Sequence, residues 1–336
     1  MRIGITYDLR AEYLNQGYGE EETAEFDSVE TIDAIDDVLG RLGHKTDRIG
    51  NIQSLTKRLA ADERWDLVFN IAEGMHGFGR EAQVPALLDA FAIPYTFSDA
   101  LVLALALHKG FTKRLVRSFG IPTPDFAIVD AASDLGGVNV PWPVIVKPVA
   151  GGTGAGISEA SKAENPKELA RACGSLLEKF RQPVLIETFL PGREFTVGVV
   201  GTGPQARVLG VMEIVFHDMS HNRGEPKIYS YANKRDYLTR VSYCLADEET
   251  TRCAADIALR VWNELGCRDA GRIDLRCDVH GNLNFLEINP LAGLHPVDSD
   301  LVILCRLVGI DHASLIETIL ASAQERVISG ARKRSA

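Results

Sequence analysis

The first hundred residues alternate between short apolar runs and amphipathic segments, and no other feature constrains the fold as strongly. Apolar runs at 2–8 and 65–71 have the length of buried strands, and residues 28–44 place apolar side chains on one helix face. A second helical segment at 81–91 and a short apolar run at 93–97 follow. Strands that alternate with helices predict βαβ units, and therefore a parallel sheet covered by helices.

The rest of the chain predicts helices and strands in a less regular order. Residues 15–25, between the first strand and helix, are acidic and contain glycine, which predicts an exposed loop or lid. Beyond residue 100 the expected elements are a helix at 101–120, a strand, glycine-rich loop and strand within 141–158, a helix at 166–180, strands at 184–190 and 194–201, mainly strands up to 294 with a helix at about 248–265, and a final helix near 311–320.

Composition excludes several classes of function. The chain has 336 residues, enough for two or three domains, and a net charge of -10, which argues against general affinity for nucleic acid or anionic lipid. Its longest apolar run, at 100–107, is too short to cross a bilayer, and we expect no signal peptide. The six cysteines contain no C-x-x-C pair and predict free thiols in a reducing compartment. We therefore expect a cytoplasmic protein.

Residues 272–294 combine the pattern of a β-hairpin with charged side chains. Apolar residues alternate on both sides of a turn at 280–282. Side chains two apart in a strand share a face, so Glu287 lies beside Asn289, and Asp274 can join them from the paired strand. Three oxygen ligands suit a hard divalent cation such as Mg²⁺. A structural ion-pair network around Arg272 is the alternative interpretation.

Two further features suggest a nucleotide. Lys147 ends an apolar strand just before the glycines of residues 151–156, and glycine lets backbone N–H groups approach phosphate oxygens closely. The spacing matches neither a Walker A loop nor the dinucleotide fingerprint. Glu187 and Glu194 flank a strand end and a turn, from which they could bind an adenine amino group and ribose hydroxyls. A flexible turn and two solvated glutamates would explain the same residues without a ligand.

The order of these residues resembles the ATP-grasp enzymes, and within them the D-alanine–D-alanine ligases and their relatives. The similarity runs from about Trp65 to Leu320 and is strongest at residues 80–99, 108–122, 143–148, 187–199 and the final hairpin with Gly293. It implies a mixed α/β chain: an ATP-grasp fold preceded by an N-terminal parallel α/β domain. The expected domains are an N-terminal substrate domain at 1–105, a central subdomain with the glycine-rich loop at 106–190, and a C-terminal subdomain with the metal site at 191–336.

The resemblance also implies roles for individual residues in binding ATP and Mg²⁺ or Mn²⁺. The metal ligands would be Asp274, Glu287 and Asn289. The phosphates would be contacted by Lys109, Lys147, Lys234, Gly152, Thr153 and Gly154. Adenine and ribose would be held by Glu187, Glu194 and backbone groups of Thr188 and Leu190. Three groups would assist the chemistry itself, namely Arg272, the Gly293 amide and Lys234.

The amino-acid pockets depart from the pattern of these ligases. The glutamate that binds the first substrate's ammonium would be Glu12 or Glu25. Where a histidine-glycine pair is expected, Glu73 stands, and His76 follows three residues later. Arg235 replaces a tyrosine after the phosphate lysine. A serine pair that grips the second substrate's carboxylate is replaced by His295, Asp298 and Ser299.

The sequence therefore predicts an ATP-dependent carboxylate–amine ligase that forms an amide bond through an acyl phosphate and releases ADP and phosphate. Two alternatives stay open: the same chemistry on an acid or amine other than D-alanine, outside cell-wall synthesis, or a noncatalytic ATP-binding protein. The expected partners are small amino-acid or amine substrates and a second copy of the chain in a homodimer, with neither nucleic acid nor membrane.

Overall fold

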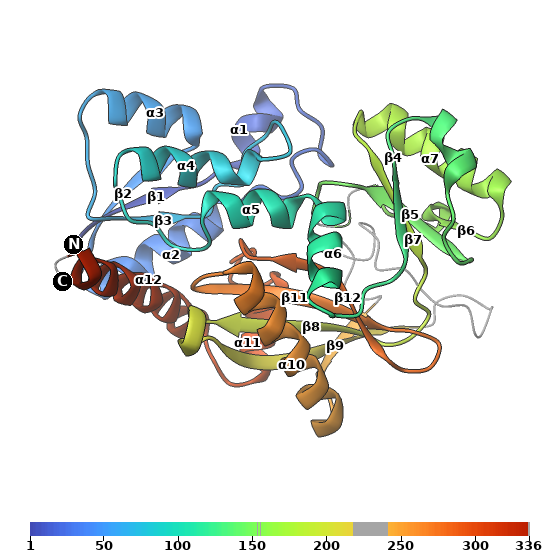
Figure 1. Ribbon diagram of the computed structural model, residues 1–336. Coiled ribbons are helices and arrows are strands. Elements are labelled where there is room, and N and C mark those ends of the chain that lie inside the picture. The colour runs from blue at the N-terminus through green and yellow to red at the C-terminus, as the bar shows by residue number, and fades with distance from the viewer. Residues whose placement is uncertain (153, 155, 218–240, 335–336) are drawn as a thin grey trace.

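A computed structural model of the protein describes residues 1–152, 154, 156–217 and 241–334. These residues form three β-sheets, each built from a separate stretch of the chain (Figure 1). The mixed α/β architecture agrees with the predicted fold class. The sheets fall within 1–105, 106–190 and 191–336, and these domain boundaries remain a prediction. No helix in the described part of the chain is both long and apolar enough to cross a membrane.

The N-terminal sheet is parallel, as the alternation of strands and helices predicts. Its strand order is β2 (Lys45–Gly50), β1 (Arg2–Thr6), β3 (Leu67–Asn70). The helices around it are α1 (Arg10–Asn15), α2 (Val29–Arg41), α3 (Ile52–Ala60) and α4 (Gln83–Ala90). Ser28 caps α2 by accepting a hydrogen bond from the Thr31 N–H, which fixes where this predicted helix begins.

The predicted helix at 101–120 is two helices, which is a correction to the sequence analysis. The helix α5 (Ala100–Leu107) ends at His108, and α6 (Lys109–Ser118) begins directly after it. The His108 side chain accepts a hydrogen bond from the Phe111 N–H and so caps α6. This break places Lys109 in the first turn of α6, with its backbone N–H on the carbonyl of Val149.

The central sheet is antiparallel and carries one long helix. Its strand order is β4 (Phe126–Val129), β7 (Val184–Thr188), β5 (Val144–Pro148), β6 (Lys162–Ala163). Leu169, Cys173 and Leu176 of α7 (Pro166–Phe180) are buried in one core with residues of β5 and β7. The glycine-rich loop follows β5, an inner strand of this sheet, and leads toward the edge strand β6.

The C-terminal sheet has the order β10 (Val241–Leu245), β9 (Arg207–Phe216), β8 (Glu194–Val200), β11 (Ala270–Cys277), β12 (Leu283–Asn289), and every pair is antiparallel. The predicted hairpin is β11 and β12, and Gly281 in its turn has φ +85°. The helix α10 (Glu248–Leu265) matches its predicted range.

Two helices complete the chain and return it to the N-terminal domain. The first, α11 (Asp300–Leu307), was not predicted, and α12 (His312–Arg334) begins near the expected position but is much longer. Leu315, Ile316 and Ile319 of α12 lie in one buried core with Ile35 and Leu39 of α2. The N-terminus and the end of α12 therefore lie at the same end of the molecule (Figure 1).

Candidate active site

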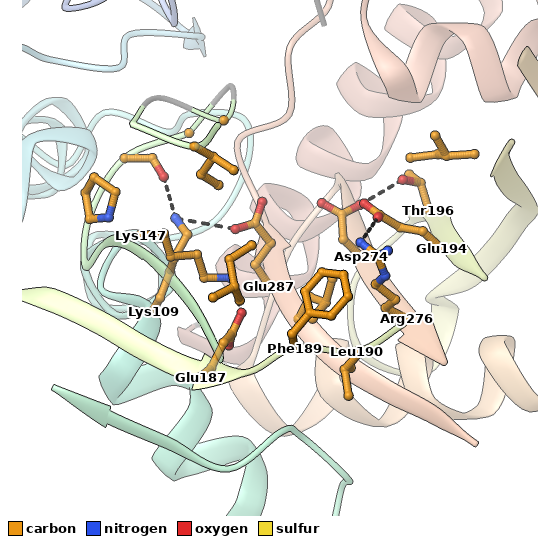
Figure 2. A pocket seen from close by; sticks show the side chains of 18 of the residues that line it. Lys109, Lys147, Glu187, Phe189, Leu190, Glu194, Thr196, Asp274, Arg276 and Glu287 are labelled. Carbon is orange, nitrogen blue, oxygen red and sulfur yellow. Dashed lines mark hydrogen bonds and ion pairs between the residues drawn. The ribbon is translucent and has the colours of Figure 1, made fainter. Parts of the chain in front are cut away.

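A cavity lies between the central and C-terminal sheets, where the predicted nucleotide residues meet. Its walls come from β5, the glycine-rich loop, β7, β8, β11 and β12. Predicted residues that line it are Lys109, Lys147, Gly152, Gly154, Glu187, Thr188, Leu190, Glu194, Arg272, Asp274 and Glu287. Figure 2 shows Lys109 and Glu287 pointing toward each other, while Glu194, Arg276, Asp274 and Thr196 form another group in the same cavity. Thr153, Lys234 and Arg235 lie outside the described residues.

Glu187 is the buried centre of one wall. Lys147 Nζ lies 2.5 Å from one carboxylate oxygen and Lys113 Nζ lies 2.9 Å from the other. Burial lowers the pKa of Lys113 to about 8, although the charge of Glu187 opposes this shift. Burial would raise the pKa of Glu187, but the two lysines outweigh it and hold that pKa low. Glu187 is therefore an ionised carboxylate whose position is fixed by two cations.

Lys113 was missed by the sequence analysis. It lies one helical turn after Lys109 on α6, and it also donates to Thr123 Oγ1 at 3.0 Å and to the carbonyl of Phe285. Its side chain is fully buried. The i, i+4 spacing of the two lysines was the available signal, because like charges on one helix face are unfavourable without a partner.

Glu194 faces the cavity from the start of β8 and is paired with Arg276, which was also missed. Arg276 Nη1 lies 2.8 Å from Glu194 Oε2, and its guanidinium lies 5.2 Å from the centre of the Phe189 ring. The two-residue repeat of a strand, which places Arg272 and Asp274 on one face of β11, also places Arg276 on that face. This repeat was the signal that could have identified Arg276.

The hairpin brings the predicted metal ligands together in register. Asp274 is paired with Glu287, and Arg272 with Asn289. Asn289 Nδ2 donates to Asp274 Oδ2 at 3.3 Å, and Lys109 Nζ lies 3.4 Å from Glu287 Oε2. Two carboxylates and an amide at the edge of a cavity fit Mg²⁺, which proteins bind through one or two carboxylates plus substrate phosphates.

The ion-pair network that the sequence left as an alternative is also present. Arg272 Nη1 contacts Asp274 Oδ2, and Arg272 Nη2 lies 3.8 Å from Asp300. Burial would lower the pKa of Arg272, but the charge of Asp274 outweighs it and raises that pKa. Thr196 Oγ1 donates to Asp274 Oδ1 at 2.9 Å. The network orients Asp274 and keeps Arg272 charged, so it is compatible with a metal site on the same carboxylates.

A second cavity adjoins the first on the side of the N-terminal domain. It is lined by residues of the glycine-rich loop, the end of the hairpin and three glutamates, and the two cavities share Lys109, Gly151, Gly152, Arg272 and Glu287. Its other lining residues include Glu25, Glu73, Glu81, Asn289 and Gly293. A Cβ atom on Gly293 would lie 2.9 Å from Ser299 Oγ, so Ser299 packs directly behind this glycine.

The remaining predicted substrate residues are placed differently. Glu12 is exposed on α1 and is not among the described lining residues of either cavity. His76 is exposed, with Nε2 3.3 Å from the Tyr18 hydroxyl. The Ser299 hydroxyl accepts a hydrogen bond from the His295 N–H, and His295 Nδ1 lies 3.7 Å from Asp298. Their predicted contact with substrate remains a prediction.

Comparisons with known proteins decide the family. A family model described as "D-ala D-ala ligase C-terminus" matches residues 115–321, more than half of the chain. The D-alanine–D-alanine ligase of Aquifex aeolicus is 32% identical over 298 residues, which cover 87% of this chain and 94% of the relative. The chain belongs to the D-alanine–D-alanine ligase family.

Further relatives agree with the resemblance inferred from the sequence. The D-alanine–D-alanine ligase of a Marinomonas species is 35% identical over 78% of this chain and 79% of its own length. An uncharacterized protein of Sinorhizobium fredii, y4sG, is 32% identical over 77% of this chain and 75% of its own length. The predicted enzyme class, an ATP-grasp ligase, is confirmed at the level of the family.

Solved structures support the same fold. The D-alanine–D-alanine ligase of Bacillus anthracis complexed with ATP has a TM-score of 0.70 at 20% identity and covers 100% of both chains. The VanG D-Ala:D-Ser ligase of Enterococcus faecalis has a TM-score of 0.70 at 20% identity and covers 96% of this chain and 99% of its own. The predicted ATP-grasp fold behind an N-terminal parallel domain is thereby confirmed.

Proposed function

We propose that this ligase joins the carboxylate of one amino acid to the amine of a second compound, with ATP as the energy source. The observation that carries the proposal is the junction between the two cavities. Lys109, Arg272 and Glu287 line both, so a phosphate in one cavity and a carboxylate in the other would meet beside them. Relatives named D-alanine–D-alanine ligase and a related structure complexed with ATP support this assignment.

The first cavity would hold ATP. Glu187 and backbone groups of Thr188 and Leu190 would bind adenine, and Glu194 would bind ribose. Lys109, Lys147 and the backbone N–H groups of the glycine-rich loop would neutralise and orient the phosphates. Asp274, Glu287 and Asn289 would hold Mg²⁺, or Mn²⁺, which supplies further charge neutralisation at the phosphates when bound.

The proposed reaction has two steps. An oxygen of the first substrate's carboxylate attacks the γ-phosphorus of ATP, the bond from this phosphorus to the β,γ-bridging oxygen breaks, and ADP leaves. The amine nitrogen of the second substrate then attacks the acyl carbon and loses a proton, and phosphate leaves with the electron pair of the broken C–O bond. Positioning and charge neutralisation dominate such phosphoryl transfers, which suits a site built mainly from lysines, an arginine and glycines.

Two residues at the junction would stabilise the second step. Arg272 stays charged beside Asp274, and its planar guanidinium suits the oxyanion that forms when the amine attacks. The Gly293 backbone lies along the second cavity, where its N–H would serve the same oxyanion. The first substrate's ammonium would bind Glu25 rather than Glu12, because only Glu25 lines the cavity.

A noncatalytic ATP-binding protein is the second candidate function. It needs the first cavity but gives no role to an arginine that lines both, so Arg272 favours the ligase. The proposal includes a cytoplasmic location, small-molecule substrates and a homodimer, while the net charge of -10 argues against nucleic acid.

The first experiment is phosphate release from ATP and Mg²⁺ across D- and L-amino acids, small peptides and polyamines, with mass spectrometry of the positive mixtures. Phosphate release with a condensed product would establish the ligase and identify both substrates. Release with D-alanine alone would assign the enzyme to dipeptide synthesis. Tight ATP binding without release for any acid would favour the noncatalytic function.

A further inference from the structure

The wall that the N-terminal domain contributes to the second cavity is unusually acidic. Glu25 precedes α2, Glu73 follows β3, and Glu81 lies just before α4. The segment between the last two folds back on itself: Gly74 has φ +69°, and a Cβ atom there would lie 2.6 Å from the Arg80 carbonyl oxygen. Asp8 Oδ2 accepts a hydrogen bond from the Gly74 N–H at 2.8 Å. The backbone therefore fixes Glu73 and Glu81 on one wall.

The described cations beside this cavity are already matched by other carboxylates. Arg80 is paired with Glu25, whose carboxylate also accepts a hydrogen bond from the Gly152 N–H. Across the cavity Lys109 is paired with Glu287, and Arg272 with Asp274. Pairing these groups leaves the carboxylates of Glu73 and Glu81 in excess.

Glu81 is the more deeply buried of these two glutamates. Its side chain is only 9% exposed, lines the cavity, and has no hydrogen bond or ion pair among the described residues. Glu73 is partly buried on the same wall and likewise has no such partner among them. A buried carboxyl group without a partner costs free energy, and a ligand that supplies a cation or a hydrogen-bond donor would remove that cost.

We propose that Glu73 and Glu81 form a subsite for a cationic group that the substrate carries in addition to its reacting groups. This inference rests on the proposed ligase function and names its substrate class: a basic amino acid, whose side-chain ammonium or guanidinium enters between the two carboxylates. Charge-assisted hydrogen bonds to both carboxylates would hold it, and a guanidinium could engage them through its several N–H donors.

The titration of the two glutamates agrees with this subsite. Burial raises the pKa of Glu81 to about 7; Arg80 and Lys109 oppose the shift and Glu25 adds to it. Burial raises the pKa of Glu73 well above its usual range, reinforced by Glu81, Glu25 and Asp27 and opposed by Arg80. A cation that enters the cavity favours the ionised forms. Its binding should therefore release protons near pH 7 and tighten as the pH rises through that value.

Matched pairs of amino acids test the subsite directly. Arginine and citrulline have the same shape but differ in side-chain charge, and lysine and norleucine differ in the same way. We expect kcat/KM from phosphate release to be at least about tenfold higher for the charged member, the size of one lost charge-assisted hydrogen bond. Equal values for both members would overturn the subsite and leave the ligase intact. If none of these amino acids supported phosphate release, the result would instead count against the ligase.

A measurement of amino-acid binding tests the subsite even if the ligase proposal fails. Calorimetry with a nonhydrolysable ATP analogue would compare arginine and citrulline at pH 6 and pH 8, in D and L forms. We expect arginine to bind about tenfold more tightly than citrulline at pH 8, with a smaller difference at pH 6. The same affinity for both at each pH would contradict the subsite.

A charge-removing variant separates this role from a structural one. Glu81→Gln keeps the volume and should lower the arginine-to-citrulline ratio toward one, whereas Glu178→Gln on the exposed face of α7 should keep it. If Glu81 only balances Arg80, the variant will change thermal stability and leave the ratio unchanged, which would overturn the proposal. Should Glu81→Gln fail to fold, Glu73→Gln gives the same comparison.

Discussion

At the scale of single residues, a substitution of Glu287 tests whether this side chain is a metal ligand or only a structural ion-pair partner. Glu287→Gln keeps the shape of the side chain but removes the charge that faces Asp274 in register and pairs with Lys109. Phosphate release should fall by more than the roughly 100-fold that loss of an outer-shell partner of a metal site costs. Thermal unfolding should stay close to that of the wild type, because the side chain is only partly buried. Full activity in this variant would contradict the magnesium proposal.

We expect substitution of Lys113 to lower the stability of the protein, because Lys113 is the fully buried partner of Glu187. Lys113→Met would leave Glu187 with Lys147 alone and should lower the free energy of unfolding by about 3–5 kcal/mol, the cost of breaking a buried ion pair from one side. Urea denaturation would measure it. The control Lys167→Met, on the exposed face of α7, should change stability by less than about 0.5 kcal/mol. Equal effects of the two changes would show that Lys147 suffices to hold Glu187.

The residues missed from the sequence share a physical cause. Lys113 and Arg276 have their partners, Glu187 and Glu194, 74 and 82 positions away in the chain, and local periodicity contains no information on such pairs. Glu81 lies in a segment that fits an amphipathic helix, where a charged residue predicts solvent exposure. The residues found, such as Asp274 and Glu287, were found because the two-residue repeat of a hairpin is local.

At the scale of elements, β2 shows why a strand can escape detection. Its sequence KTDRIG has one buried apolar side chain, Ile49, and strand patterns are recognised by several. Its side chains are held instead by charges: Asp47 accepts from Arg58 and Arg2 and from Trp65 Nε1 at 3.0 Å. The prediction of one continuous helix at 101–120 was wrong for the opposite reason. Its apolar pattern is strong but continues through the break at His108, so the pattern does not reveal where α5 ends.

The Asp47 cluster predicts how stability depends on pH. Hydrogen bonds from Arg58 hold the pKa of Asp47 well below its usual range, so this carboxylate stabilises the fold above the unfolded pKa of about 3.9 and loses that effect as pH falls further. Asp47→Asn should cost about 1–3 kcal/mol at pH 7. Urea unfolding at pH 7 and pH 3 should show the gap between wild type and variant narrowing at pH 3. A gap that stays constant would contradict the ionic role.

At the scale of the whole molecule, the last helix joins the end of the chain to its beginning. The segment α12 follows the C-terminal subdomain in sequence but packs against α2 of the N-terminal domain, and Ile316 is fully buried in their shared core. The second cavity is made the same way, from glutamates of the N-terminal domain and the hairpin of the C-terminal subdomain. Its geometry therefore depends on how α12 holds the two together.

This dependence predicts that a core substitution far from the cavity will weaken the whole molecule. Ile316→Ala should lower the free energy of unfolding by about 2–5 kcal/mol, because it opens a space in a core that packing cannot readily refill. Ile328→Ala, on the same helix with a side chain 54% exposed, should change it by less than about 0.5 kcal/mol. Tryptophan fluorescence and circular dichroism should report one coincident transition in both variants, since Trp65 and Trp262 lie in different hydrophobic cores and we expect α12 to couple their unfolding. If Ile316→Ala instead separated the two transitions, the N-terminal domain would unfold on its own, and α12 would serve that domain without coupling it to the rest.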